Sequence, residues 1–245
     1  MITRFKPALY LHTYENYFPC SFETFIHYSS LFHYNTLIKL KDVNMNDLVD
    51  DRSVHFSLQT SFKNTIFEFD VQQTPIYAYQ QRISDKEVRI VYMYFFAYNS
   101  GYFGVGAHVG DIEHVSVFLK QNDDSGEYEI QKMYYAAHGS KWGKWVDKQD
   151  IEFIGDHPVI YISKGSHASY HKPGIYWRVF GLANDCCDRG FLWTPQVIDV
   201  NNKSVMLYQG KWGTVRNFVA SSWWKSEHIH SASFWKRMFA PCLLS

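Results

Sequence analysis

The chain has 245 residues, of which 46% are hydrophobic and 18% aromatic, and it carries 24 acidic and 24 basic side chains. This composition is that of a globular protein and excludes a disordered chain. The zero net charge disfavours a nucleic-acid partner, because such partners select strongly basic surfaces.

The sequence shows no pattern of membrane targeting. Residues 1–18 hold no apolar core followed by a small-residue cleavage site, so no signal peptide is expected. The longest apolar run, residues 91–98, is far shorter than the roughly 20 residues of a membrane-spanning helix. The four cysteines lack zinc-type spacing and are expected to be free thiols of a reducing compartment. These patterns predict a cytoplasmic protein that is peripheral to membranes where it meets them.

Strand patterns dominate the chain. Short apolar or alternating segments, typical of strands, are separated by clusters of Gly, Asn, Asp and Pro. They are residues 53–60, 65–71, 87–98, 114–120, 128–138 and 157–164. Because residues 87–98 are apolar on both faces, they are expected to form a central strand that is covered on both sides.

Helical patterns are few. Residues 21–32 place apolar side chains on one stripe behind Ser21, a candidate N-cap, and residues 231–240 form a second short helical pattern. The sequence therefore predicts a mainly β fold, a β-sandwich or a jelly-roll-like pair of sheets with a few short helices. No linker divides the chain, so residues 1–245 are expected to form a single domain, with residues 1–50 as a candidate appended N-terminal lobe.

Two carboxylates occur where an apolar strand is expected to begin. In a strand over Glu113–Lys120, alternate side chains share a face, so Glu113 lies with Val115 on the inward side. Asp111 precedes it by two residues and extends the same face. An unpaired buried carboxylate is costly, so two neighbours need a compensating charge. A divalent cation would supply it, with His108 as a third ligand.

The metal ligands predicted from this pattern are His108, Asp111 and Glu113. Carboxylate-rich ligation suits Mg²⁺ or Ca²⁺, whereas histidine favours Zn²⁺ or Mn²⁺, so the pattern predicts a divalent cofactor without naming it. The alternative is that the two acids face water or pair with Lys and Arg side chains.

Three histidines are candidates for catalytic proton transfer, because histidine titrates near neutral pH. His114 follows Glu113 directly, whereas His138 and His167 come at the ends of expected strands, in Gly-Ser turns where sites are often built. The alternative for each loop histidine is a surface or hydrogen-bonded structural role.

Several segments together resemble one known family. HVGDIEHVSV, residues 108–117, is similar to the H-V-G-D-W-E-H-V signature of the vacuolar protein sorting-associated protein 62 family. Further blocks match in order at residues 8–21, 94–101, 136–139, 163–174, 184–195 and 208–213. Ile112 replaces the usual Trp and Thr13 a usual Pro, and neither change removes an ionisable group. The family's name implies a role in delivery to the vacuole and no particular chemistry.

A more distant likeness is to the necrosis-inducing cytolysin family. GAHVGDIE, residues 106–113, resembles its G-H-R-H-D-W-E motif, which lies on a β-sandwich and holds a divalent cation. The likeness implies His108, Asp111 and Glu113 as ligands, with Asn99 nearby. It also implies a membrane-facing role, since those cytolysins engage glycolipid head groups.

Three functions remain open, and with them whether the protein is an enzyme. The first is metal-dependent binding of a lipid or glycan head group, which Trp- and Lys-containing segments at 140–145 and 221–226 favour unless their tryptophans belong to the core. The second is a metal-dependent hydrolase of phosphoesters or similar substrates, with His114, His138 or His167 as acid or base. The third is a structural or assembly protein whose cation only holds a loop.

Overall fold

The computed structural model describes residues 1–47, 53–58, 70–100, 107–138, 143–178, 184–201, 208 and 210–213. The chain divides into two compact units. The first comprises Met1–Glu15, Pro75–Tyr94 and Glu113–Asn201, and the second Asn16–Thr74, Phe95–Ile112 and the chain from Asn202. Residues 1–50 are thus shared between the units, and the single domain with an appended lobe stays a prediction.

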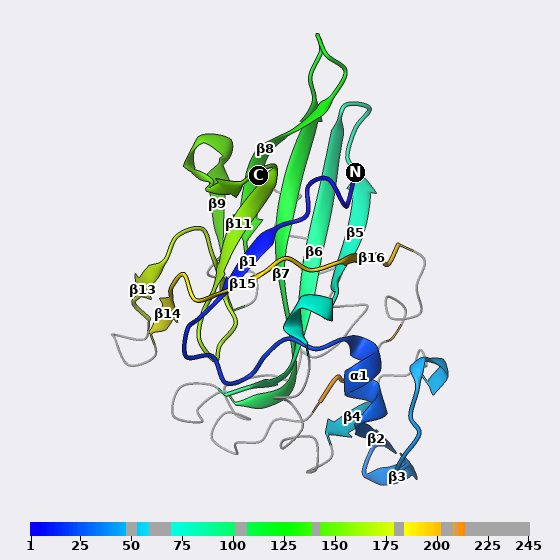
Figure 1. Ribbon diagram of the computed structural model, residues 1–245. Coiled ribbons are helices and arrows are strands. Elements are labelled where there is room, and N and C mark those ends of the chain that lie inside the picture. The colour runs from blue at the N-terminus through cyan, green and yellow to red at the C-terminus, as the bar shows by residue number, and fades with distance from the viewer. Residues whose placement is uncertain are drawn as a thin grey trace. The chain divides into compact units, whose positions relative to one another are not determined.

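A six-stranded sheet has the strand order β16-β5-β6-β7-β8-β9 (Figure 1). Its strands are β5 (Ile76–Arg82), β6 (Glu87–Asn99), β7 (His108–Gln121), β8 (Tyr128–Tyr135), β9 (Lys144–Asp147) and β16 (Val197–Asp199). Strand β6 lies inside this sheet and is buried along nearly all its length, which confirms the expected central strand over 87–98. The boundary between the two units cuts β6 and β7.

A second sheet in the first unit has the order β10-β11-β1-β15, with β12 paired to β11. Its strands are β1 (Ala8–Leu11), β10 (Phe153–Ile154), β11 (His157–Ile162), β12 (Ser169–Tyr170) and β15 (Phe191–Trp193). Strand β1 runs parallel to β11 and antiparallel to β15.

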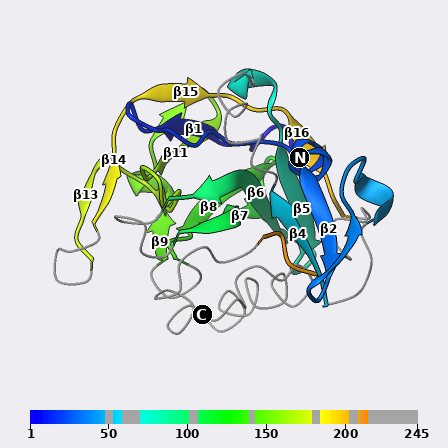
Figure 2. The same cartoon turned by 90° about the horizontal axis from the view of Figure 1, so that it is seen from below.

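The two sheets of the first unit lie one over the other. Figure 2 shows β1, β11 and β15 in one layer and β6, β7 and β8 in the other. The Tyr135 hydroxyl on β8 donates a 3.2 Å hydrogen bond to the carbonyl of Val159 on β11, and the Ser169 amide donates to the Ala136 carbonyl at 2.9 Å. The mainly β fold is therefore confirmed, and the first unit is a β-sandwich.

Three smaller elements complete the first unit. Strands β13 (Gly174–Tyr176) and β14 (Asp185–Cys187) form a separate two-stranded antiparallel sheet. A 3₁₀ turn, η5, spans Lys148–Asp150.

In the part of the chain that the structure describes, no helix has the length and apolar character needed to span a bilayer.

The second unit combines one helix with a three-stranded sheet of order β3-β2-β4. Its elements are α1 (Phe22–His27), β2 (Ser29–His33), β3 (Thr36–Lys39) and β4 (Val54–Leu58), with 3₁₀ turns η1 (Met45–Asp47) and η3 (Val71–Gln73). Aromatic rings fill its core: Phe22 and Phe25 on α1 pack against Trp212 and Phe95 at centroid distances of 4.6 and 4.9 Å. Such ring contacts add to the free energy of simple apolar burial.

Two elements predicted from the sequence differ from those in the structure. The helix expected over 21–32 begins as predicted, with the Ser21 hydroxyl accepting from the Thr24 amide, but it ends at His27. Residues 29–33 instead pair as β2 with β4, so sheet pairing overrides the helical stripe. Asp70 caps the 3₁₀ turn η3 and does not extend a strand over 65–71. Residues 65–69 and the expected helix 231–240 lie outside the described residues.

Candidate functional site

Strand β7 begins five residues earlier than the sequence predicted, at His108 and not at Glu113. Gly110 lies in this additional part of the strand. Its φ of +73° is left-handed, and a Cβ at this position would lie 2.4 Å from the Trp212 carbonyl oxygen, so no other residue fits without a shift. Both acids are consequently inside the strand, and only 6% of Asp111 and 7% of Glu113 is exposed.

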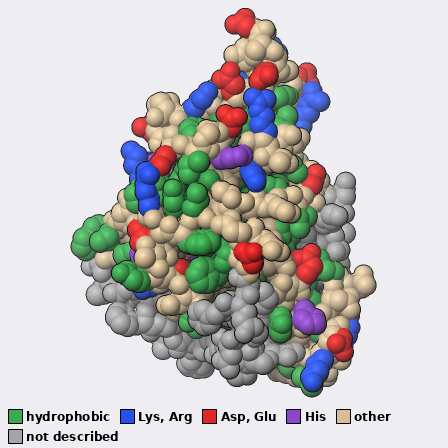
Figure 3. All heavy atoms as spheres, in the orientation of Figure 1, with side chains coloured by type: hydrophobic (Ala, Val, Ile, Leu, Met, Phe, Trp, Pro, Cys, Tyr) green, Lys and Arg blue, Asp and Glu red, His purple; other side chains and the backbone are tan. Residues whose placement is uncertain are grey.

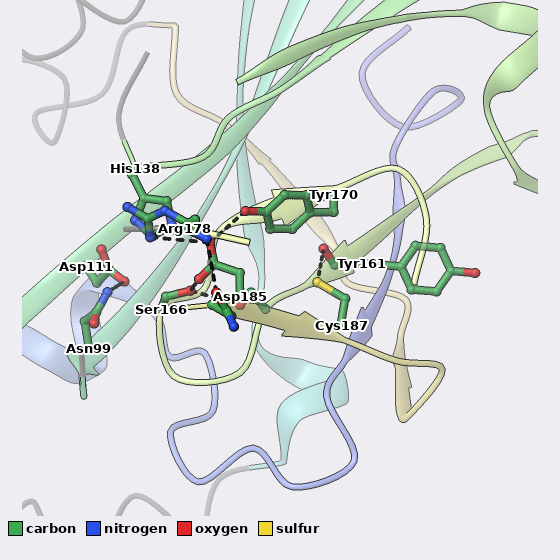
Figure 4. A network of polar contacts seen from close by, with 11 residues as sticks. Asn99, Asp111, His138, Tyr161, Ser166, Tyr170, Arg178, Asp185 and Cys187 are labelled. Carbon is green, nitrogen blue, oxygen red and sulfur yellow. Dashed lines mark hydrogen bonds and ion pairs between the residues drawn. The ribbon is translucent and has the colours of Figure 1, made fainter. Parts of the chain in front are cut away.

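Asp111 lies between two other candidate residues of the second unit. The side-chain amide of Asn99, the last residue of β6, donates a 2.9 Å hydrogen bond to Asp111 Oδ2 (Figure 4). The Nε2 atom of His108 lies 3.3 Å from Asp111 Oδ1. All three side chains are buried. The predicted pair of His108 and Asp111 is therefore brought together, with Asn99 as the third member.

The chemistry of these groups fits a divalent cation. Carboxylate, imidazole and amide oxygen are all ligands that Mn²⁺, Zn²⁺ or Ca²⁺ accept in proteins. Glu113 follows two residues further along the same strand. Within the described residues, however, no group of three or more His, Cys, Asp or Glu side chains is arranged to hold a metal ion. The metal site of His108, Asp111 and Glu113 therefore stays a prediction.

A second buried aspartate, Asp185 on β14, gathers four side chains of the first unit (Figure 4). The Ser166 hydroxyl donates to Asp185 Oδ1 at 2.6 Å, and the Tyr170 hydroxyl donates to Oδ2 at 2.6 Å. His138 Nε2 lies 2.6 Å and Arg178 Nη1 3.4 Å from the same Oδ2. The guanidinium of Arg178 also contacts the His138 ring nitrogen.

These contacts decide the charge of Asp185. Burial by itself would raise the pKa of this carboxyl, but the hydrogen bond and charge of His138 lower it, and the hydroxyls of Ser166 and Tyr170 lower it further, to about 2. Burial and the neighbouring Asp185 carboxylate in turn raise the pKa of the Tyr170 phenol. Asp185 is therefore ionised at neutral pH and paired with Arg178.

The backbone at two predicted histidines is unusual. His138 has φ +51° and His167 has φ +57°, a left-handed conformation that is uncommon for residues with a Cβ. Such conformations concentrate at functional sites and tight turns. His138 lies at the edge of the Asp185 cluster, with 10% of its side chain exposed.

His167 is completely buried beside another acid that the sequence pattern did not single out. Its Nε2 atom lies 3.8 Å from Glu15 Oε1, and the other oxygen of Glu15 accepts from the Gly165 amide at 2.8 Å. Both side chains are inaccessible, at 0% and 1% exposure. In the described structure this pair ties the 163–169 turn to the N-terminal segment.

His114 lies on β7 with 2% exposure, and its Nε2 atom has no hydrogen-bond partner among the described residues. Burial, and then the charge of Arg89, lower the pKa of His114 to about 3. The ring is therefore neutral at physiological pH. His114, His138 and His167 thus have three different environments, and a catalytic role for each stays a prediction.

Of the four tryptophans expected at an interface, only Trp145 lies within the described residues. It is half-buried, and its ring packs on Tyr134 and Phe118 with the Lys132 ammonium 4.6 Å from its centroid. Trp142, Trp223 and Trp224 lie outside the described residues. Trp177, which the sequence pattern did not single out, is 77% exposed.

The fold and the buried acid–histidine clusters define a β-sandwich protein with polar groups set into its strands. The family model described as vacuolar protein sorting-associated protein 62 matches residues 1–189. The chain therefore belongs to the vacuolar protein sorting-associated protein 62 family, and the resemblance seen in the sequence is confirmed. The sequence matches no curated protein.

Solved structures resemble the chain at low identity. One described as a toxin fold for microbial attack and plant defense is 16% identical, with 82% of this chain and 73% of that chain covered and a TM-score of 0.46. NLPPya in complex with mannosamine is 14% identical, with coverages of 82% and 72% and a TM-score of 0.42. Necrosis and Ethylene inducing Protein 2, from the causal agent of cocoa's Witches Broom disease, is 12% identical, with coverages of 90% and 87% and a TM-score of 0.41.

Sequence reasoning missed the residues that hold the histidines. Glu15 and Asp185 fall in the matching blocks 8–21 and 184–195, but nothing in the sequence pairs either of them, or Arg178, with a histidine.

Proposed function

We propose that this protein binds the polar head group of a lipid or glycan through a divalent cation held at the start of β7. Asp111, His108 and Asn99 would hold the cation, with Glu113 as the further ligand on the same strand. The observation that carries the proposal is the burial of Asp111 against His108 and Asn99, two residue types that ligate metals. A cation there would neutralise a carboxylate that is otherwise costly to bury.

The cation would supply a positive charge that accepts oxygen atoms of the bound ligand. Hydroxyl and phosphate oxygens are both suitable, which is why lipid and glycan head groups share this chemistry. The zero net charge of the chain argues against a nucleic-acid partner. The proposal places the protein in the cytoplasm, at the surface of membranes, in a trafficking role that agrees with the name of its family.

The test compares head-group binding with and without a chelator. Wild-type protein, Asp111→Asn and the control Asp123→Asn, a surface aspartate paired with Lys86, are passed over immobilised lipids and glycans in excess Mn²⁺ or Ca²⁺. We expect wild type and Asp123→Asn to bind, and binding to be lost in chelator and in Asp111→Asn. Equal binding by all three proteins in chelator would rule out the metal-dependent function.

The second candidate is a metal-dependent hydrolase. The observation that favours it is the 2.6 Å contact between His138 and Asp185, since a carboxylate that orients an imidazole is how many enzymes prepare a general base. A bound cation would supply a water of lowered pKa. Turnover of a phosphodiester panel that is lost in His138→Gln, with head-group binding retained, would favour this function over simple binding.

A further inference from the structure

A small hairpin of the first unit presents an unusual outer face. Strands β13 and β14 pair only with each other among the described strands, with Ile175 opposite Cys186 and Tyr176 opposite Asp185. Because alternate residues of a strand point to opposite sides, Ile175 shares one side with Cys186, and Trp177 follows directly after the strand. Ile175 is 60% and Trp177 77% exposed, whereas Asp185 and Cys187 are buried.

The other face of the hairpin fixes it to the sandwich. The Tyr176 ring stacks on Tyr170 with a centroid distance of 3.6 Å, and its hydroxyl donates to the Lys172 carbonyl at 2.7 Å. The Ser166 hydroxyl donates to Asp185 at 2.6 Å, and the Lys164 amide donates to the Cys186 carbonyl at 3.0 Å. The hairpin is therefore held firmly while Ile175 and Trp177 face solvent, which lowers the entropic cost of docking them.

The exposed apolar side chains are conspicuous on the surface. Figure 3 shows hydrophobic side chains gathered at the surface where β13 and β14 lie, beside basic side chains. An exposed Ile and an exposed Trp two residues apart are unfavourable on a free surface and suit the water–lipid boundary, where Trp is enriched.

The charged side chains near the hairpin indicate a partner of negative charge. Arg178 and Asp185 pair with each other, Asp188 follows β14 directly, and Lys172 and Lys144 are both exposed. Their influence is visible at His171, where burial and then the charges of these two lysines lower the imidazole pKa, against a smaller opposing effect of Asp150. Basic side chains near the exposed Ile175 and Trp177 complement a surface of anionic lipid.

We propose that the β13–β14 hairpin is a docking surface for an anionic lipid bilayer, with Ile175 and Trp177 entering the interface and Lys172 and Lys144 meeting lipid phosphates. The inference rests on the proposed function in that the target is a membrane, but it needs no cation. It names the part of the molecule that touches the bilayer, apart from the residues proposed to read the head group.

The first test measures binding to vesicles of phosphatidylcholine with about a third phosphatidylserine, made in chelator. The Ile175→Ser/Trp177→Ala double variant should lose at least tenfold in partitioning relative to wild type, and Lys172→Glu several-fold. The control Phe191→Ala removes another exposed apolar side chain of the first unit and should bind as wild type. Circular dichroism melting verifies that all variants fold. Wild-type binding by a folded double variant would overturn the proposal.

A second measurement locates Trp177 directly. Brominated lipids should quench part of the tryptophan fluorescence of wild type, and this quenching should disappear in Trp177→Phe. Sedimentation in solution tests a second copy of the chain as the occupant: a wild-type dimer that the double variant dissolves, with vesicle binding unchanged, would overturn the lipid assignment. Because vesicle docking is measured in chelator, its loss and the loss of metal-dependent head-group binding are separate results.

Discussion

Two buried aspartates, one in each unit, each contact a histidine, but the other side chains around them differ. Asp185 meets His138 and two hydroxyls, with a protein cation, Arg178, 3.4 Å away. Asp111 meets an amide and an imidazole, from Asn99 and His108. The comparison teaches that burial of an acid does not by itself identify a metal site. The side chains that contact the acid decide whether it stabilises the fold or suits a cation.

The largest effect is expected at Asp185. Asp185→Asn leaves the Arg178 guanidinium without its carboxylate, and breaking a buried pair in this way costs about 3–5 kcal/mol. Urea denaturation should show this loss equally with and without chelator, because Arg178 and not a metal balances the charge. The control Asp85→Asn, whose side chain is fully exposed beside Arg82, should leave stability almost unchanged. A loss at Asp185 that requires metal would reverse the roles of the two aspartates.

The next effect is a dependence of stability on pH that comes from the first unit. In the folded chain the pKa of His114 is lowered to about 3 by burial and by Arg89, while an unfolded histidine has a pKa near ~6.5. Below pH ~6.5 the unfolded chain binds a proton that the folded chain does not, so stability falls by about 1.4 kcal/mol per pH unit.

Asp185 acts in a separate window. Its folded pKa of about 2 is depressed, so its contribution is complete above the unfolded value of 3.8 and is lost as the pH falls toward 2. Denaturation between pH 7 and 5 therefore excludes Asp185 and reports on the histidines, and the lowered pKa values of His55 and His171 add to the slope of His114. His114→Gln should flatten the slope there, and an unchanged slope would show that His114 does not titrate on unfolding.

A somewhat smaller effect is expected at Asp111, and only with metal. At a hundredfold excess of cation over its dissociation constant, binding stabilises a folded protein by about 2.7 kcal/mol. Wild type should melt at a higher temperature in Mn²⁺ or Ca²⁺ than in chelator, and Asp111→Asn should show no such shift. Equal shifts in the two proteins would mean that the metal binds elsewhere.

The smallest loss of stability is expected on removal of the cation–π contacts of Lys132. Lys132 lies over the Trp145 ring at 4.6 Å and over Phe118 at 5.6 Å. Contacts of this kind contribute about 0.5–1 kcal/mol at exposed sites. Lys132→Met should cost no more than this in urea denaturation, and Lys120→Met, an exposed lysine of β7, should be neutral. A loss of several kcal/mol would give Trp145 a larger structural role than its half-burial indicates.

Local patterns were sufficient for the strands and for one half of the site. The strands β6 and β7 could be predicted from the apolar run and from the alternation of side chains. His108 and Asp111 could be predicted to lie together because they are close in the sequence and share strand β7. The early start of β7 was not predicted, because alternation does not extend through Gly110, which has a left-handed backbone and lies close to the distant Trp212. The end of α1 was missed for a similar reason, because β4 supplies the partner for residues 29–33.

The Asp185 cluster could not be assembled from the sequence. His138 and Asp185 are 47 residues apart, and Glu15 and Gly165 are 150 apart. The pairing of β1 with β11 and the backbone bonds from Ser169 to Ala136 and from Lys164 to Cys186 bring such segments together. A periodicity identifies the face on which a side chain lies, but it does not identify the partner that lies opposite.

The central claim is that a cation belongs with Asp111 and not with Asp185. The most direct test is elemental analysis of purified wild type, Asp111→Asn and Asp185→Asn after equilibration with divalent metals and gel filtration. We predict about one equivalent of metal in wild type and in Asp185→Asn, and none in Asp111→Asn. Metal-free wild type, or an undiminished equivalent in Asp111→Asn, would contradict the account.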